Sequence, residues 1–394
     1  MKERIKQVLK SRRFRRWLVV PLLVCVLGAV SGCHTLSFYG QAVRGQYQMF
    51  AHEQPIQKLM NEPGTPERLK ARFQLLDDLR DFAGHELKLP VDDHYRKYVD
   101  LHRPYVVWNV EATPEFSMQP KTWWYPLVGS LEYRGYFSKP GATNYARVLL
   151  KKGYDVSVGG VVAYSTLGWF KDPVLNTFIF EPDSDLAEIL FHELGHQRVF
   201  ARGDTDFNEA FATSVGEEGT RRWLKAKGDK AGLDAYLGYL HRNDQFVHLV
   251  MSTRARLETL YGDTHTESGK VRATEKNKNV PAAQLRAQKQ QIMDDMKKEY
   301  ETLKAGWGGA EEYAGWFKHT LNNAQLNSIA AYYDFVPGFE QLLAQNGGDL
   351  ERFYEAAKAL SKKPKTERHE ALRLLAQQAR AGLQAHTPKP QPGT

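Results

Sequence analysis

The spacing of apolar residues divides the chain into helical and strand-like regions. Apolar side chains recur every three or four residues through Ala42–Met60 and Pro66–Leu87, which predicts amphipathic helices over most of residues 33–103. Residues 104–165 instead contain short runs rich in β-branched and aromatic residues, separated by Gly and Pro. Such runs predict the strands of a small sheet. The expected strands are Val106–Val110, Ser130–Tyr133, Tyr154–Val158 and Val162–Tyr164.

Helical spacing returns at Asp185 and continues almost to the C-terminus. Leu233–Tyr261 and Ala282–Leu303 have the length and polarity of two long helices, and a further helical region spans Glu311–Leu360. Residues 262–281 are nearly devoid of apolar side chains, which predicts a mobile loop. Residues 385–394 carry three prolines and are predicted to be a disordered tail. We therefore expect an α+β fold with a mixed core over residues 104–230 and a helical region over 231–384.

The first 32 residues have the pattern of an export signal. Eight of them are basic and one is acidic, and a 14-residue apolar run follows from Trp17 to Val30. A basic segment, a short apolar segment and small residues at its end are typical of a signal peptide. The apolar run is shorter than the roughly 18–20 residues that span a membrane, and Pro21 and Gly28 interrupt it.

This N-terminal segment accounts for most of the charge. The chain has 54 basic and 46 acidic residues, a net charge of +8, which would ordinarily suggest binding to nucleic acid. Only 8 basic residues and 1 acidic residue precede Cys33, so the remainder carries a net charge of +1. Nucleic acid is therefore not an expected partner. The 42% hydrophobic content excludes intrinsic disorder and allows a substantial core.

The residues Val30–Cys33 resemble a bacterial lipobox. The resemblance implies that residues 1–32 are a lipoprotein signal peptide, that Cys33 is lipidated, and that the protein is anchored to a membrane in the bacterial cell envelope, facing the periplasm. An uncut signal anchor and, from Ser11–Arg13, a twin-arginine signal are the alternatives. Cys25 would leave with the signal, so no disulfide can form and a metal site must use His, Asp or Glu.

The strongest chemical motif is H-E-x-x-H at residues 192–196. On a helix, His192 and His196 project from one face at positions i and i+4 and can present two imidazoles to one zinc ion. Glu193 is the candidate general base that takes a proton from the attacking water. The alternative is an ordinary helix with two surface histidines.

A catalytic zinc usually has three protein ligands, so a third ligand is expected. Asn208–Thr213 follows His196 after a predicted turn and resembles the N-E-x-F-A stretch of gluzincin metallopeptidases, which implies that Glu209 is the third ligand. The spacing is shorter than in the large aminopeptidase and thermolysin-like families. Asp204 and Asp206 remain alternative ligands, although both lie on the turn itself.

Further segments are similar to the bacterial putative-aminopeptidase lipoprotein family, which is assigned to the gluzincin-like zinc peptidases. The resemblance covers the chain from Cys33 through Tyr354 and implies a zincin-like fold more firmly than it implies a substrate. The segments that carry it are Tyr39–Gln46, Arg103–Asn109, Tyr133–Phe137, Ala163–Phe170, Phe191–Gln197, Asn322–Ala324 and Gly347–Tyr354.

Well-studied aminopeptidases hold the amino group of the substrate with a glutamate in a Gly-x-Met-Glu-Asn loop. The corresponding stretch here, Gly160–Tyr164, has no acid, so Glu111, Glu115 and Glu132 are the candidates to supply one. Val156–Thr166 is the candidate strand edge for pairing with an extended substrate, or else an internal strand. The candidate donors to the oxyanion are Tyr332, Tyr333, His319, Tyr133 and Tyr136.

These observations predict a lipid-anchored zinc peptidase with a zincin-like α+β core and extensive helical flanks. His192, His196 and Glu209 would bind Zn²⁺, Glu193 would act as the base, and a peptide would be the substrate. The alternatives are a metalloendopeptidase and a catalytically silent envelope scaffold or binding lipoprotein. Intact Glu193 favours an enzyme. Protein partners and oligomeric state are left open.

Overall fold

The computed structural model describes residues 38–167, 170–265, 271–273 and 280–386. The chain divides into two compact units, residues 1–52 and 53–394. In the first unit, residues 38–51 form a helix, as the spacing of apolar residues predicts. The predicted signal peptide, Cys33 and residues 387–394 of the predicted tail lie outside the described residues. Among the described helices, none combines the length and the apolarity that a membrane span needs.

The second unit begins with two helices and a small sheet. The elements are β1 (Gln54–Pro55), α3 (Ile56–Asn61), α4 (Glu67–His85), β2 (Lys97–Val99) and β8 (Val174–Leu175). The helix α4 buries Phe73, Leu76 and Leu79, which fall on one helical face. β2 pairs antiparallel with β1 and parallel with β8. The region predicted as helical therefore also contains two strands, β1 and β2, because runs of two and three residues are too short to show a period.

The main sheet has the strand order β6-β3-β7 and is antiparallel throughout. Its strands are β3 (Val107–Pro114), β6 (Tyr133–Tyr136) and β7 (Tyr154–Val161), and a separate hairpin joins β4 (Trp123–Tyr125) to β5 (Gly129–Leu131). The predicted strand segments are largely confirmed. However, residues 162–164 lie beyond the end of β7.

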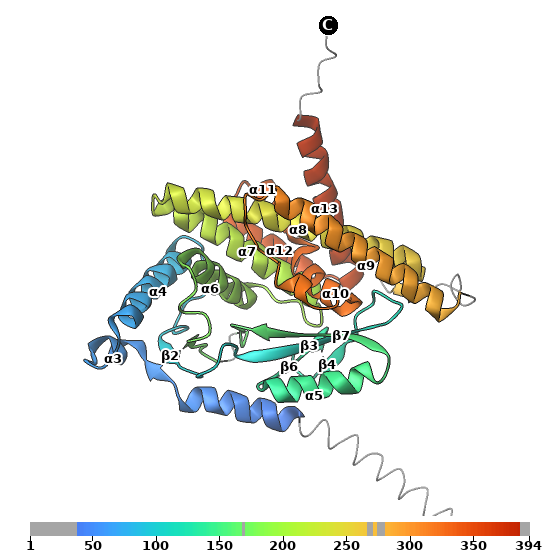
Figure 1. Ribbon diagram of the computed structural model, residues 1–394. Helices are drawn as coiled ribbons and strands as arrows, with labels where there is room; N and C mark the ends of the chain where they lie inside the picture. Colours follow the sequence, from blue (N-terminus) through green and yellow to red (C-terminus); the bar gives the residue numbers. More distant parts are fainter. Residues whose placement is uncertain (1–37, 168–169, 266–270, 274–279, 387–394) are drawn as a thin grey trace, which may run out of the picture. The chain divides into compact units, whose positions relative to one another are not determined.

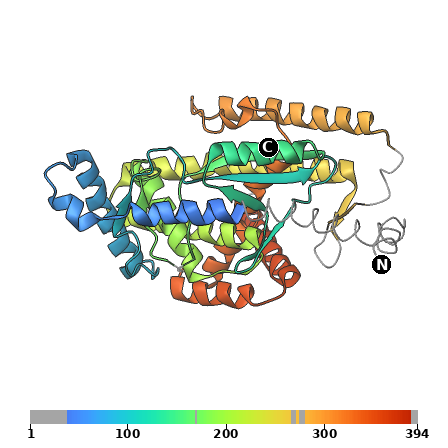
Figure 2. The same ribbon diagram turned by 90° about the horizontal axis from the view of Figure 1, so that it is seen from below.

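Helices cover both faces of this sheet (Figure 1). The helix α5 (Lys139–Leu150) packs on one face, and Figure 2 shows it running alongside the strands. Its first turn is capped by Ser138, whose side chain accepts a hydrogen bond from the Gly141 amide. The helix α10 (Asn323–Tyr333) lies on the opposite face, where Asn327 donates a hydrogen bond to Thr113 Oγ1 of β3.

The remaining helices build the rest of the second unit. They are α6 (Asp183–Arg198), α7 (Thr205–Ala226), α8 (Lys230–Tyr261), α9 (Ala282–Ala305), η2 (Trp316–Lys318), α11 (Val336–Gln345), α12 (Leu350–Ser361) and α13 (Lys365–His386). The two long helices α8 and α9 pack together through a cluster that includes Phe246, Val250, Met293 and Met296. The mixed, mainly helical α+β class is thus confirmed.

Between α8 and α9, the region predicted as a mobile loop contains regular structure. β9 (Asp263–His265) and β10 (Val271–Ala273) pair antiparallel, so the described parts of this region form a hairpin. A lack of apolar side chains does not prevent a backbone from pairing with a neighbouring strand.

The close approach of α6 to α7 depends on glycines. A side chain at Gly195 would meet the Ala212 Cα at 3.4 Å, and one at Gly216 would meet the carbonyl oxygen of Glu188 at 3.0 Å. Because both positions lack a Cβ, the two helices can approach each other closely at these two points. This contact determines how near α7 comes to the histidines of α6.

Candidate metal centre

The helix α6 presents both histidines of the motif on one side, as the i, i+4 spacing predicts. His196 is buried, and the His192 side chain keeps 17% of its surface exposed. The ring centroids of the two residues lie 4.8 Å apart. The histidines therefore form an adjacent pair in a largely buried environment, unlike the surface histidines of an ordinary amphipathic helix.

The turn between α6 and α7 is closed by Asn208. Its side-chain amide donates to the carbonyl oxygen of Ala201 at 2.9 Å, and its side-chain oxygen accepts from the Ala201 amide at 2.7 Å. Asp204 is the N-cap of α7 and accepts a hydrogen bond from the Phe207 amide. These contacts begin α7 so that Glu209, in its second turn, faces α6. The role of Asn208 could not be read from the motif alone.

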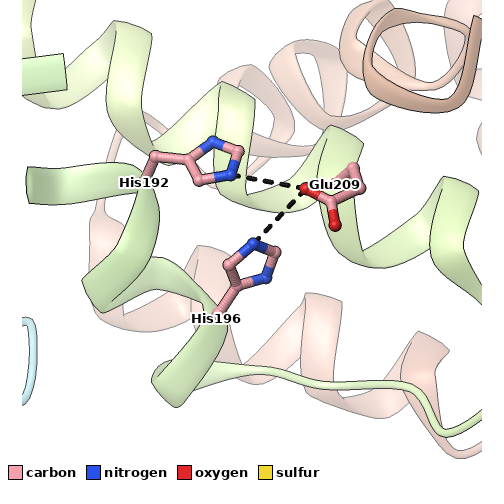
Figure 3. A group of neighbouring side chains, drawn as sticks. All are labelled: His192, His196 and Glu209. Atoms are coloured by element: carbon pink, nitrogen blue, oxygen red, sulfur yellow. Dashed lines mark ion pairs between the residues drawn. The ribbon is translucent and has the colours of Figure 1, made fainter. Parts of the chain in front are cut away.

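Glu209 lies between the two imidazoles (Figure 3). Its Oε2 atom is 3.4 Å from His192 Nε2 and 3.4 Å from His196 Nε2. These separations exceed the usual range of a hydrogen bond, about 2.7–3.2 Å. Zinc bonds of about 2.0–2.1 Å at a tetrahedral angle would separate neighbouring ligand atoms by about 3.3 Å. The three residues thus form a group that can hold a metal ion, and its geometry and chemistry fit zinc.

The electrostatics of the group follow from burial and mutual attraction. Burial raises the pKa of Glu209, but the two histidines outweigh it and hold the pKa well below its ordinary value. Burial lowers the pKa of His192. For His196, burial lowers the pKa, but the attraction of Glu209 and Glu193 together outweighs it, so the pKa is raised. An ionised carboxylate between two imidazoles is the state that binds a divalent cation.

Glu193 is buried beside this group. Burial raises the pKa of its carboxyl to about 8, and its Oε2 atom has no hydrogen-bond partner among the described residues. Burial, Asp172 and Glu193 together raise the pKa of Tyr95, whose hydroxyl is also unpartnered in the described part of the chain. Tyr95 adopts a left-handed backbone with φ of 59°. Nothing in its local sequence indicates that it lies near the motif.

Two of the five candidate oxyanion donors lie near the metal-binding group. The Tyr332 ring stacks on His192 with centroids 6.1 Å apart, and Glu209 is the main cause of its raised pKa. Burial raises the pKa of Tyr133, and Glu209 and Glu193 raise it further.

The other three candidates lie elsewhere. Burial likewise raises the pKa of Tyr333, but the charged groups around it are Glu188 and Glu217. Tyr136 packs against Tyr145, and His319 ends the short helix η2.

The alternative ligands Asp204 and Asp206 belong to a different group. Asp204 is fully buried, with its carboxylate 2.9 Å from His369 Nε2 and 3.4 Å from Lys365 Nζ. Arg368 adds an ion pair at 3.2 Å. Asp204, Asp206 and His369 are close enough to share a cation, but Lys365 and Arg368 already supply positive charge there. This cluster fastens α13 to the start of α7.

The three candidate glutamates for the substrate amino group differ in their surroundings. Glu115 pairs with Arg286 at 2.5 Å, so its charge is already compensated. Glu111 and Glu132 line a small pocket together with Tyr133 and Tyr332. A larger cavity of about 420 Å³ between α7, α11 and α12 touches none of the three metal-binding residues.

The strand β7 has β3 on one side and no strand on the other among the described residues, as the predicted substrate-binding edge requires. A side chain at Gly160 would lie 2.4 Å from the ring of Tyr105. Tyr105 of the same chain therefore occupies the space that the missing side chain of Gly160 leaves.

The comparisons with known proteins give one match. No curated protein matches the chain, and no solved structure does. A family model described as "Putative aminopeptidase" matches residues 37–372, most of the chain, including His192, His196 and Glu209. The chain belongs to this putative aminopeptidase family.

Proposed function

We propose that this protein is a zinc-dependent aminopeptidase with a zincin-like core, in which His192, His196 and Glu209 hold the ion. The observation that carries the proposal is the placement of one Glu209 oxygen 3.4 Å from each imidazole Nε2 atom. Two neutral imidazoles and one carboxylate are a usual donor set for catalytic zinc, and they leave a position open. Membership of the family supports a peptide substrate.

Zinc bound by these residues would polarise the scissile carbonyl and activate a water molecule. Glu193 follows His192 directly in α6, and its raised pKa, about 8, suits a group that exchanges protons near neutral pH. We assign Glu193 the role of base, which accepts a proton from the attacking water. It then passes that proton to the leaving amine.

The negative charge that develops on the carbonyl oxygen needs hydrogen-bond donors. Tyr332 and Tyr133 are the proposed donors, because both lie in the field of Glu209 and both keep their hydroxyl protons through raised pKa values. The stacking of Tyr332 on His192 supports its assignment as the nearer donor.

The test combines metal analysis with peptide hydrolysis. Purified protein lacking residues 1–32 should contain one zinc per chain, lose activity on chelation and recover it when zinc is returned. It should cleave peptides with a free amino terminus and leave N-acetylated ones intact. Cleavage of both kinds would indicate an endopeptidase. Zinc binding without hydrolysis of either kind would support the scaffold alternative, and absence of stoichiometric metal would refute the proposal.

We further propose that the protein is a lipoprotein of the bacterial envelope that faces the periplasm. The support is the lipobox-like sequence Val30–Cys33 behind a basic and apolar segment. A diacylated Cys33 would serve as the anchor, because two acyl chains hold a protein stably at a membrane.

Replacement Cys33→Ser should remove the anchor, because only the thiol can be lipidated. We expect the variant to leave the membrane fraction, while the unmodified chain stays in it and incorporates labelled palmitate. Cys25→Ser is the matched control and should retain anchoring. If Cys33→Ser remains in the membrane at its unprocessed size, the N-terminal segment is an uncut signal anchor.

A further inference from the structure

The first helix of the described chain has two unlike faces. Phe38 and Met49 are buried, with 8% and 1% of their surface exposed. Tyr39, Val43 and Tyr47 keep 37%, 69% and 69% of their surface exposed. Single exposed apolar side chains are common, but these three follow one another at intervals of four residues and so form one line along the helix. We call this line the Tyr39–Tyr47 stripe.

The composition of the stripe suits the boundary between water and lipid. From Tyr39 to Tyr47 the helix rises by about 12 Å, so the three side chains form one continuous surface. A tyrosine ring is apolar and its hydroxyl is polar, which favours the headgroup region of a bilayer. Arg44 is exposed beside the stripe and can extend its guanidinium toward a phosphate. An apolar line with a basic residue at its border is typical of a helix that lies in the plane of a membrane interface.

The position of the stripe in the sequence decides which surface it meets. Tyr39 follows Cys33, the proposed site of the lipid, by six residues. Six residues span at most about 20 Å when fully extended. With the acyl chains of Cys33 in a bilayer, the first turn of the helix therefore lies within about 20 Å of the membrane surface, whatever conformation the intervening residues adopt. The bilayer is then the extended surface within reach of the stripe.

We propose that the Tyr39–Tyr47 stripe lies on the membrane surface and holds its helix parallel to the bilayer. This inference rests on the proposed lipid anchor at Cys33, which brings the stripe to the membrane. The partner is a bilayer with anionic headgroups, in which the stripe enters the headgroup region and Arg44 pairs with lipid phosphate. The lipid alone is an attachment at one point, whereas the stripe adds a second contact that fixes the direction of the helix.

The first experiment measures membrane binding without the lipid. The protein lacks residues 1–32 and carries Cys33→Ser, and the vesicles contain phosphatidylethanolamine and phosphatidylglycerol. The protein should cosediment with these vesicles. The double replacement Val43→Ser/Tyr47→Ser should lower its partition coefficient about 10-fold, the effect of removing two partly buried apolar side chains. Its melting temperature should be unchanged, because both side chains are exposed.

The matched control is Leu237→Ser, which removes an apolar side chain that is 43% exposed on α8. We expect this variant to bind the vesicles as the parent does. Equal binding by the double variant, or no binding by the parent protein, would overturn the proposal.

The second experiment locates the stripe in the lipidated protein. Cys25 and Cys33 are the only cysteines of the chain, so after removal of residues 1–32 and lipidation of Cys33 an introduced cysteine is the only free thiol. A polarity-sensitive fluorophore at Val43→Cys should emit at shorter wavelength in the same vesicles and resist quenching by aqueous acrylamide. Gln48 is also exposed but lies about 140° from Val43 around the helix axis. The same fluorophore at Gln48→Cys should stay quenched, and equal quenching at both positions would refute the stripe.

These readouts separate the stripe from the lipid anchor. Labelled palmitate at Cys33 without vesicle binding that depends on Val43 and Tyr47 would retain the lipoprotein and refute the stripe. Vesicle binding that depends on these two residues, in a protein whose N-terminal segment stays uncut in cells, would refute the lipoprotein and retain the stripe. Self-association that the double variant loses, with no binding to vesicles, would assign the stripe to a second copy of the chain and overturn the proposal.

Discussion

Replacement Glu193→Gln should reduce kcat by about 10²- to 10⁴-fold, the usual contribution of a positioned general base, while zinc content remains at one per chain. The amide of Gln has the shape of the carboxyl but cannot accept the proton of the attacking water. Glu193 is buried beside His192 and His196 without being one of the three metal-binding residues. Steady-state hydrolysis and metal analysis on the same preparation measure both quantities.

The matched control is Glu188→Gln in the same helix. Glu188 is also enclosed, but its carboxylate accepts a hydrogen bond from Tyr236 at 2.7 Å, away from the metal group. We expect its kcat to stay within a few-fold of the unmodified protein. Full activity of Glu193→Gln would show that another group takes the proton, and the mechanism proposed for this site would then be wrong.

Replacement Glu209→Gln should have an equally large effect through a different cause, the loss of the metal. The carboxylate is the only negative charge among the three proposed ligands. Even residues that merely support ligands typically contribute 10- to 100-fold in metal affinity, so we expect a loss greater than about 100-fold. Competition with a zinc chelator measures the affinity. Added zinc should also raise the melting temperature of the unmodified protein and not that of the variant.

Glu217→Gln provides the control for Glu209. Glu217 lies two turns further along α7 and is also buried, but it is not in the metal-binding group. Its zinc affinity should be unchanged. If Glu209→Gln keeps full zinc affinity while Asp204→Asn or Asp206→Asn loses it, the third ligand is one of these two aspartates at the start of α7, where Asp206 lies in the first helical turn and not on the connecting turn.

The fold class was predictable because the main elements have clear periods. Helical spacing identified α4, α8 and α9, and β-branched and aromatic runs identified β3 and β7. Short elements were not predictable. β2, β9 and β10 have three residues each, fewer than a period analysis can resolve, and β2 also pairs with strands that are distant in sequence.

The proximity of His192, His196 and Glu209 was predictable because local geometry governs it: an i, i+4 pair, a short turn and a second helix. The residues that surround these three side chains were not predictable from the sequence. Tyr332 reaches His192 from α10, over a hundred residues further along the chain, so only tertiary packing brings the two together. Tyr95 depends on a left-handed backbone that its residue type does not signal.

The cluster that fastens α13 to Asp204 has a consequence for the order of assembly. Asp204 begins the helix that carries Glu209, and its partners Lys365, Arg368 and His369 all come from α13. A growing chain makes α13 after every proposed ligand, so the start of α7 lacks this tether until α13 has been synthesised. Chains that end before α13 would therefore lack the ion pairs that hold the first turn of the Glu209 helix.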